Sequence, residues 1–335
     1  MILAGDVGGT KSNLAFFELE NGQLKTRFEK TLPSHKFASL AELLKEFFGA
    51  TELRADFSCL SIAGPVKERR CQTPNLPWIV EADEVERTTG MRRLELINDL
   101  EANARGLAML GPSDFAIINE GEPNAVGNAA VISAGTGLGE AGLFWDGEKH
   151  LPFASEGGHG NFGPNDDLQT ELLQYMRKVH NHVSYERVLS GPGLYNIYSF
   201  MRDSGKFPEP DWLKEELKVS DPAATISKNA ISGKAEICVE ALNMFVTIYG
   251  SEAGNLAMKV MALGGVYIGG GIAPKIITKL QEPLFMKSFT NKGRMKTLLQ
   301  AIPVKVILND KTALLGAAEF ALSISDKSVS SHRTA

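Results

Sequence analysis

The segment ILAGDVGGT, residues 2–10, decides the fold, because a short apolar strand leads into a turn rich in glycine and threonine. The segment VISAGTG, residues 131–137, repeats this plan, and a second strand-like run follows each copy. The chain therefore contains a weak internal repeat. Two ordinary hairpins are the simpler alternative, but a two-residue hairpin turn, such as that indicated by Asn21-Gly22, needs fewer glycines.

The two glycine-rich turns are candidate phosphate loops, because glycine allows backbone amides to approach an anion closely. Facing each other, the loops would clamp a polyphosphate between two lobes. A third glycine-rich segment, residues 269–271, lies between a strand-like and a helix-like run and fits an adenosine site. The candidate nucleotide-binding residues are Gly5, Asp6, Val7, Gly8, Gly9, Thr10, Gly135, Thr136, Gly137, Gly270 and Gly271.

Asp6 ends a strand that is expected to be buried, where an unpaired carboxylate is costly. It either caps the turn or serves as a magnesium partner through water, since Mg²⁺ keeps several of its waters. The sequence has no GxxxxGK[ST] P-loop, no HExxH motif and no cysteine cluster, so no P-loop, metalloprotease or zinc site is expected.

Hydrophobic periodicity predicts an α/β protein in which the order of strands and helices restarts near residue 129. Strands are expected at residues 2–7, 12–19, 24–32, 57–62, 94–97, 129–133, 140–145, 266–269 and 304–308. Helices are expected at 39–48, 100–111 and 312–322, and they dominate 167–264 apart from a break at Pro208 and Pro210. The polar, serine-rich residues 326–335 are expected to form a flexible tail.

Three polar segments indicate a second ligand. Asn98-Asp99 lies where a strand meets a helix, so Asp99 is either the helix N-cap or a base that takes the proton of an attacking hydroxyl. Glu156 and His159 are separated by two glycines, which leave both side chains free to contact one small polar ligand. By pattern alone, Glu186 is a helix-surface residue.

Composition indicates a globular protein of two domains or lobes, with 335 residues, 43% hydrophobic residues and a net charge of −5. No run of lysine and arginine forms a nucleic-acid stripe and no apolar stretch is long enough for a bilayer, so neither nucleic acid nor a membrane is an expected partner. Three cysteines without a CxxC pair, and no recognisable signal peptide, favour a reducing cytoplasm.

Taken together, these segments resemble the bacterial glucokinases of the hexokinase, actin-like and heat-shock ATPase superfamily over roughly residues 2–322. The motifs are GDVGGTK, NLPW, INDLEANARG, SAGTGLGEA, SEGGHGNFGP, YERVLSGPGL and GGGIAPK, in the family's order. The resemblance implies an α/β fold of two actin-like (ribonuclease H-like) lobes with mixed sheets and a cleft between them. One lobe would comprise residues 1–110 and 309–325, with the final helix packed back on it, and the other residues 111–308.

The resemblance also implies an activity, the transfer of the γ-phosphoryl group of ATP, with Mg²⁺, to the 6-hydroxyl of glucose. In the family, residues matching Asn98, Asp99, Glu156, His159 and Glu186 hold the sugar and the one matching Asp99 is the base, which makes Glu186 a sugar ligand. Family members are commonly homodimers. The helix-like region 234–263 is expected to have apolar surface to spare for a partner copy, although core packing would explain it equally.

Several alternatives stay open. A kinase of the same fold for another hexose has the same motifs, although the repressor-related branch usually adds a cysteine-rich zinc loop that residues 161–167 lack. A sugar-sensing transcriptional regulator needs an N-terminal helix-turn-helix, which a phosphate loop starting at Gly5 disfavours. An actin-like filament or chaperone ATPase needs neither Asn98-Asp99 nor the pair of Glu156 and His159.

Overall fold

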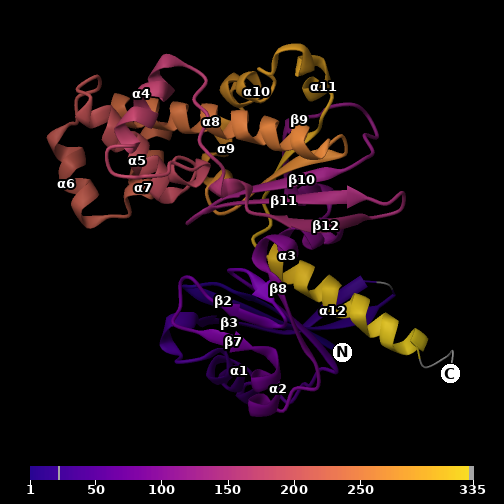
Figure 1. Ribbon diagram of the computed structural model, residues 1–335. Helices are drawn as coiled ribbons and strands as arrows, with labels where there is room; N and C mark the ends of the chain where they lie inside the picture. The colour runs from indigo at the N-terminus through magenta and orange to yellow at the C-terminus, as the bar shows by residue number, and fades with distance from the viewer. Residues whose placement is uncertain (22, 332–335) are drawn as a thin grey trace. The chain divides into compact units, whose positions relative to one another are not determined.

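The computed structural model describes residues 1–21 and 23–331 and divides the chain into two compact units (Figure 1). Unit 1 comprises two segments of the chain, Met1–Gly111 and Asn309–Ala335. Unit 2 is the continuous segment Pro112–Leu308. Both units contain a mixed sheet with helices, which confirms the predicted α/β class.

Unit 1 is built on a five-stranded sheet of order β3-β2-β1-β4-β8. The strands are β1 (Ile2–Val7), β2 (Lys11–Glu20), β3 (Gln23–Pro33), β4 (Phe57–Ile62) and β8 (Leu94–Asn98). β1 pairs antiparallel with β2 and parallel with β4, and β4 pairs parallel with β8. The hairpin turn was predicted at Asn21 and Gly22. Asn21 has a left-handed φ of 52°, and Gly22 lies outside the described residues.

Successive side chains along each strand of unit 1 point to opposite faces of the sheet, so both faces carry apolar side chains. Leu3, Val7 and Phe16 pack on one face against α1 (Leu40–Gly49) and α2 (Ala82–Thr89). Ile2, Ala4 and Phe17 belong to the cluster on the other face, together with residues of α3 (Asp99–Gly106) and α12 (Thr312–Ser331).

The last helix is longer than predicted. α12 continues past the expected end at Leu322 to Ser331, so its polar end is part of the helix. Residues 332–335 of the predicted tail lie outside the described residues. The remaining strands of unit 1, which the sequence did not predict, are short. They are β5 (Val66–Lys67), β6 (Arg70–Gln72) and β7 (Ile79–Glu81), and they form a small antiparallel sheet.

Unit 2 is built on a six-stranded sheet of order β12-β11-β10-β13-β14-β9. The strands are β9 (Phe115–Asn119), β10 (Ala129–Ala134), β11 (Leu138–Trp145), β12 (His150–Ser155), β13 (Gly265–Gly269) and β14 (Val304–Ile307). β10 pairs antiparallel with β11 and parallel with β13, as β1 does with β2 and β4. The internal repeat predicted from the two glycine-rich segments is confirmed.

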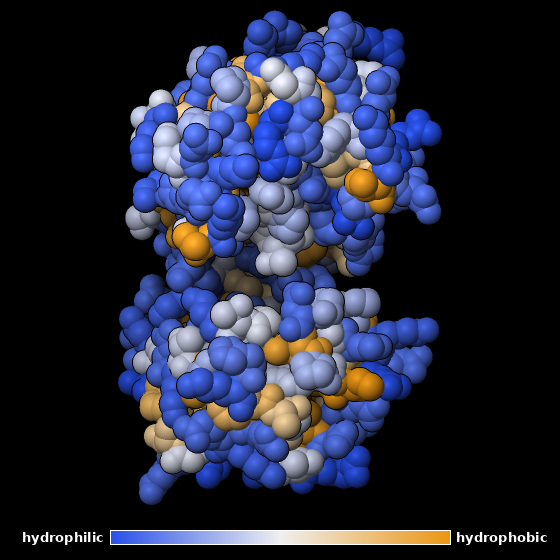
Figure 2. Space-filling view, turned by 90° about the vertical axis from the view of Figure 1, so that its left-hand side faces the viewer, coloured by the Kyte–Doolittle hydropathy of each residue, from blue (hydrophilic) through white to orange (hydrophobic). Residues whose placement is uncertain are grey.

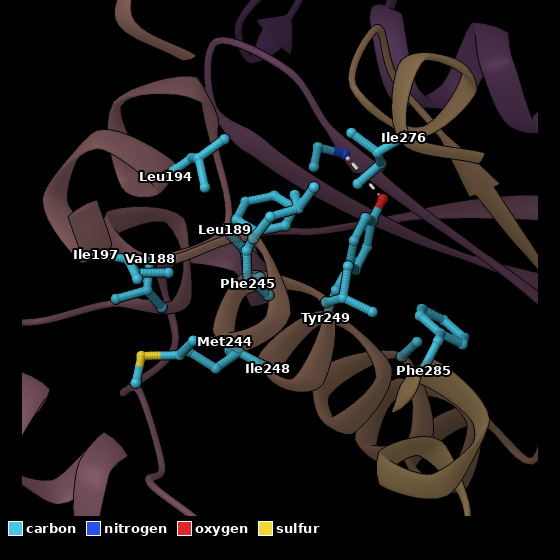
Figure 3. Packing of buried hydrophobic residues seen from close by; sticks show 14 of the residues in the cluster. Val188, Leu189, Leu194, Ile197, Met244, Phe245, Ile248, Tyr249, Ile276 and Phe285 are labelled. Atoms are coloured by element: carbon cyan, nitrogen blue, oxygen red, sulfur yellow. Dashed lines mark hydrogen bonds between the residues drawn. The ribbon is translucent and has the colours of Figure 1, made fainter. Parts of the chain in front are cut away.

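Most helices of the chain belong to unit 2. They are α4 (Asp167–Met176), α5 (Gly191–Asp203), α6 (Asp211–Val219), α7 (Pro222–Ile231), α8 (Glu236–Val260), α9 (Ile277–Leu280), α10 (Pro283–Phe289) and α11 (Lys296–Gln300). The expectation that the region of α8 has spare apolar surface is wrong. Apolar side chains on several sides of this helix, including Phe245 and Tyr249, are buried within the main cluster of unit 2 (Figure 3). α8 is therefore a core helix.

The face of the molecule in Figure 2 is mainly hydrophilic, and its hydrophobic residues form scattered patches. Within residues 1–21 and 23–331, no helix combines the length and the hydropathy that a membrane span requires.

Candidate functional site

The candidate residues of unit 1 gather at one edge of its sheet. β1, β4 and β8 are parallel, so their carboxyl ends meet at the same edge. Asp6 lies near the end of β1, where it pairs in register with Ser61 of β4. Asn98 is the last residue of β8, and Asp99 is the first residue of α3.

Asn98 is the N-cap of α3, so the alternative in which Asp99 is the cap is wrong. The side-chain oxygen of Asn98 accepts a hydrogen bond from the backbone amide of Leu100 at 2.9 Å. Its amide nitrogen donates to the carbonyl of Gly64 at 2.9 Å. The two bonds fix the Asn98 side chain at the strand end and allow Asp99 to follow it in the first turn of the helix.

Asp99 is a half-buried carboxyl group with an altered acidity. Burial and, next, the nearby charge of Asp6 raise its pKa to about 6, against the lowering effect of a hydrogen bond from the Leu100 amide. The pKa of Asp6 is also raised by burial, against the lowering effects of a hydrogen bond from Ser61 and the charge of Lys11. A carboxyl group with a pKa near 6 is suited to accept a proton at neutral pH.

The first predicted phosphate loop connects β1 to β2. The amide of Gly8 donates to the carbonyl of Lys11 at 3.1 Å, so it is used to close the turn. The hydroxyl of Ser34 donates to the carbonyl of Gly8 at 2.7 Å and supports the loop from the other side. Within the described part of the chain, the amides of Gly9 and Thr10 have no hydrogen-bond partner, and Thr10 is exposed. These two amides remain available to an anion.

In unit 2, the second predicted phosphate loop is shorter than expected, because β11 begins at Leu138 and leaves a turn of Gly135, Thr136 and Gly137. The amide of Gly135 donates across the turn to the carbonyl of Gly137 at 2.8 Å. The carbonyl of Gly135 accepts from the amide of Gly191 at the start of α5 at 2.8 Å. The turn is therefore held on both sides, and the exposed Thr136 lies at its tip.

The predicted adenosine segment lies next to this second turn. Gly270 has a left-handed φ of 83°, and a Cβ there would overlap the carbonyl group of Ala134, the residue that precedes the turn. The carbonyl of Ala134 also accepts a hydrogen bond from the amide of Ile272 at 3.3 Å. Gly270 and Gly271 are thus placed beside the turn 135–137, as a site for one nucleotide requires.

The hydroxyl of Tyr249 on α8 contacts the backbone just before each of the two glycine-rich segments of unit 2. Its hydroxyl accepts a hydrogen bond from the amide of Ala134 at 3.2 Å (Figure 3) and donates to the carbonyl of Ile132 at 3.3 Å. It also lies 3.5 Å from the carbonyl of Gly269 at the end of β13. The core helix therefore fixes the ends of β10 and β13, from which the two glycine-rich segments extend.

The three predicted sugar ligands of unit 2 form one cluster. His159 Nε2 lies 3.9 Å from an oxygen of Glu156, and His159 Nδ1 lies 4.0 Å from an oxygen of Glu186. The other oxygen of Glu186 accepts a hydrogen bond from the amide of Leu138 at 3.0 Å, directly after the second phosphate turn. Glu156 and His159 are exposed, so their polar atoms are accessible to a ligand.

Backbone hydrogen bonds join the segments that carry these residues. The amide of Tyr185 donates to the carbonyl of Gly160 at 3.0 Å, and the amide of Phe162 donates to the carbonyl of Val183 at 2.9 Å. Glu186 lies in a short 3-10 turn, Tyr185–Arg187, rather than on the surface of a long helix as its pattern indicated. Because this turn lies close to the segment with Glu156 and His159, the side chain of Glu186 belongs to their cluster.

The family model for glucokinase matches residues 3–324. The chain belongs to the glucokinase family. It is 36% identical to the glucokinase of Nostoc sp., with 95% of this chain and 98% of the relative covered. A glucokinase structure from an Antarctic psychrotroph is 33% identical, with a TM-score of 0.82 over 96% of this chain and 98% of the other. A ROK family glucokinase from Streptomyces griseus, in complex with glucose and AMPPNP, shares the fold at 19% identity, with a TM-score of 0.65 over 96% and 99% of the chains.

In this member of the glucokinase family, each unit brings its own candidate residues together. Unit 1 holds Asp6, Asn98 and Asp99 at one sheet edge, and unit 2 holds the turn 135–137 beside Glu186 and His159. The residues 1–21 and 23–331 contain no group of three or more His, Cys, Asp or Glu side chains arranged to bind a metal ion. One acidic residue near the cluster, the buried Glu140, was not singled out from the sequence, although a glutamate inside an apolar strand was a signal for it.

Proposed function

We propose that this glucokinase-family chain transfers the γ-phosphoryl group of ATP to the 6-hydroxyl of glucose, giving glucose 6-phosphate and ADP. The observation that carries the proposal is the hydrogen bond between Glu186 and Leu138. It joins a cluster of polar side chains suited to sugar hydroxyls to a glycine-rich turn suited to phosphates. Family membership supports both the sugar and a nucleoside triphosphate donor.

In this proposal, most contacts with the sugar and the donor come from residues of unit 2. Glu156, Glu186 and His159 bond to glucose hydroxyls, and carboxylates make strong hydrogen bonds to such donors. The free amides near Thr136 and Thr10 contact phosphate oxygens, and Gly270 and Gly271 lie against the adenosine. The side chain of Asn98 is already fixed by two hydrogen bonds, and its second amide N–H donates to the sugar.

Asp99 is the general base in this reaction. It takes the proton from the 6-hydroxyl as the sugar oxygen forms its bond to the γ-phosphorus and the bond between that phosphorus and the β,γ-bridging oxygen breaks. Burial and the charge of Asp6 raise the pKa of Asp99 to about 6, which makes Asp99 a better proton acceptor while it stays mostly ionised at neutral pH. Water must be kept from the γ-phosphoryl group, because it is a competing nucleophile.

Mg²⁺ fits the donor chemistry of unit 1. The carboxylate of Asp6 is a hard oxygen ligand that accepts a single side-chain hydrogen bond from the described residues, from Ser61 at 3.2 Å, and it lies next to a loop with free amides. A single carboxylate acting through water suits Mg²⁺, which keeps most of its own waters. When bound, the ion would offset part of the charge of the phosphates.

We also propose that the protein acts as a homodimer in the cytoplasm, where its product would enter glycolysis. The cytoplasmic location is supported by Cys59, Cys71 and Cys238, which are free thiols in the structure. The dimer rests on the family resemblance alone, because α8 is a core helix and does not supply the apolar surface. Sedimentation equilibrium would measure the mass of the assembly, and a monomer at micromolar concentration would contradict this part of the proposal.

A coupled assay with a panel of hexoses and phosphoryl donors tests the proposed function. We expect the highest kcat/KM with glucose and ATP. A higher value with fructose, mannose or N-acetylglucosamine would assign the chain to another sugar of the same fold. ATP hydrolysis that does not respond to any sugar would instead favour an actin-like ATPase.

A further inference from the structure

Glu140 is a buried acid directly behind the cluster of Glu156 and His159. It lies on β11, is 1% exposed, and its side chain is on the same face of the sheet as that of its neighbour in register, Ile132. Its Oε1 atom is buried and has no hydrogen-bond partner within the described residues. An unpaired buried carboxyl oxygen is destabilising, so its position requires an explanation.

The second oxygen of Glu140 lies against the turn that carries the predicted sugar ligands. A Cβ built on Gly157 would overlap Oε2 of Glu140 and lie 2.9 Å from its carboxyl carbon. Only glycine leaves room for this contact. Because Gly157 directly follows Glu156 and belongs to the 3-10 turn Gly157–His159, a shift of the Glu140 carboxyl group moves the backbone between the two ligands.

A second buried acid, Glu252 of α8, completes the arrangement. It is fully buried, its Oε1 lies 3.1 Å from the ammonium of Lys259, and its Oε2 accepts a hydrogen bond from Asn255 at 2.7 Å. The same Asn255 amide nitrogen also donates to the hydroxyl of Tyr185, the residue before Glu186, at 3.2 Å. The two buried acids therefore lie under both segments of the sugar cluster.

Of the two acids, Glu252 forms an ion pair with Lys259, and Glu140 forms no ion pair within the described residues. Lys259 pairs with Glu252, while Lys292 donates to the hydroxyl of Ser251 at 2.9 Å and has a pKa lowered by burial. Burial and, next, the charge of Glu252 raise the pKa of Glu140 to about 7, against the lowering effect of the charge of Lys259. Glu140 is therefore neutral at mildly acidic pH and becomes ionised slightly above neutrality.

We propose that Glu140 is a positioning residue for the sugar-binding turn: its neutral form packs under Gly157 and holds Glu156 and His159 in place, and its ionised form displaces the turn. The proposal rests on the proposed function, because it takes Glu156 and His159 as sugar ligands. The ionised form needs water or a cation that the packed site does not supply, and outward movement of the turn is the simplest way to admit water. The titratable groups that face Glu140 and Glu252 are Tyr185, Tyr249, Lys259 and Lys292, and Glu156 and His159 lie on the turn itself.

The test compares wild type with Glu140→Gln, which has the neutral shape at every pH. KM for glucose and kcat are measured between pH 6 and 8.5. In wild type, KM for glucose should be roughly fivefold higher at pH 8.5 than at pH 6.5, the change that about 1 kcal/mol of distortion produces. In Glu140→Gln this rise should be absent, and kcat and KM for ATP should match wild type.

Glu148→Gln is the matched control, because Glu148 is an exposed glutamate in the hairpin between β11 and β12. It should keep the wild-type pH profile. Glu140→Ala should raise KM for glucose at every pH, because it leaves a void under the turn, and Gln should rescue this loss. Identical pH profiles for wild type and Glu140→Gln would overturn the proposal.

Hydrogen exchange without sugar separates this proposal from the proposed function. After correction for intrinsic rates, the amides of residues 157–160 should lose protection between pH 6 and pH 8 in wild type but keep it in Glu140→Gln. If glucose is phosphorylated but exchange and KM show no dependence on Glu140, the function stands and the positioning role is wrong. If exchange depends on Glu140 but no glucose is phosphorylated, the turn responds as proposed and the sugar assignment is wrong.

Discussion

Asp6 and Asp99 are two carboxyl groups at the same edge of the unit 1 sheet, and each lies at the carboxyl end of a parallel strand. Burial is the main cause of the raised pKa of Asp99, and the charge of Asp6 is the next largest. In the proposed reaction the two carboxyl groups have different tasks. Asp6, hydrogen-bonded by Ser61, is the proposed ligand for a cation, and Asp99 is the proposed proton acceptor near neutral pH.

Asp99→Asn should lower kcat by about 10²–10⁴-fold, the usual contribution of a general base, and leave glucose binding largely intact. Rapid-quench kinetics and calorimetric titration with glucose would measure the two quantities. Asp211→Asn is the matched control, because Asp211 also opens a helix but is exposed on α6. A kcat close to wild type in Asp99→Asn would remove Asp99 from the role of base.

The activity should fall in acid as Asp99 gains a proton. Because the pKa of Asp99 is raised to about 6, the base is ionised above this pH and is lost as the pH falls through it. The profile of kcat/KM should therefore bend downward near pH 6. Asp6→Asn removes the like charge, so the bend should move to lower pH in the activity that remains. An unchanged midpoint would show that Asp6 does not influence the base.

Glu156→Gln should weaken glucose binding by roughly 10–150-fold, since a hydrogen bond to a charged group contributes about 1.5–3 kcal/mol. The affinity for ATP should not change. Isothermal calorimetry gives both affinities. Glu120→Gln, at an exposed glutamate directly after β9, is the control and should bind glucose as wild type does. Equal loss of ATP affinity with normal glucose affinity would place the sugar elsewhere.

Gly316→Ala should destabilise unit 1, because a Cβ at Gly316 of α12 would overlap the carbonyl of Ala102 in α3. Overpacking of this kind costs about 1–3 kcal/mol. Urea unfolding would measure the change. Gly49→Ala at the end of α1 has open space and should be neutral or stabilising by about 0.5–1 kcal/mol. Equal stability of the two variants would contradict close packing of α3 on α12.

Glu140→Gln should make the protein more stable than wild type at pH 8. A raised pKa means that the folded state binds the proton more tightly than the unfolded chain. The stability from this group is therefore complete below the ordinary pKa of 4.5 and is lost as the pH rises through about 7. The loss is on the order of 1–3 kcal/mol. Melting temperatures of both proteins from pH 5 to 8.5 should converge in acid and diverge in base, and parallel curves would contradict this.

The parts of the fold that the sequence predicted well are those with strong local signals. β1 and β4 have their predicted bounds, because their apolar runs end at polar or glycine residues. The edge strands β9 and β12 were missed, since both are short and their side chains are intermediate or exposed rather than buried. The burial of α8 also could not be predicted from its pattern, because a helix that packs on several sides has no single apolar face.

The candidate site was predictable where spacing alone joins the residues. Glu156 and His159 are three residues apart, and the structure brings them within 3.9 Å. Glu186 became a candidate only through the family resemblance, because its contact with Leu138 joins positions far apart in the chain. The sequence left open whether Asp99 is the N-cap of α3, since Asn98 and Asp99 are both residue types that cap helices well. Only the geometry shows that Asn98 is the cap.

Unit 1 is assembled from two distant segments of the chain, and this affects how the protein folds during translation. Unit 2 is continuous, so its sheet can close while the ribosome is still adding the last residues. The sheet of unit 1 cannot bury both of its faces this early. The face with Ile2, Ala4 and Phe17 packs in one cluster with Leu314 and Ala317 of α12, which are synthesised near the end of the chain. The part synthesised first therefore cannot complete its core until α12 has been made.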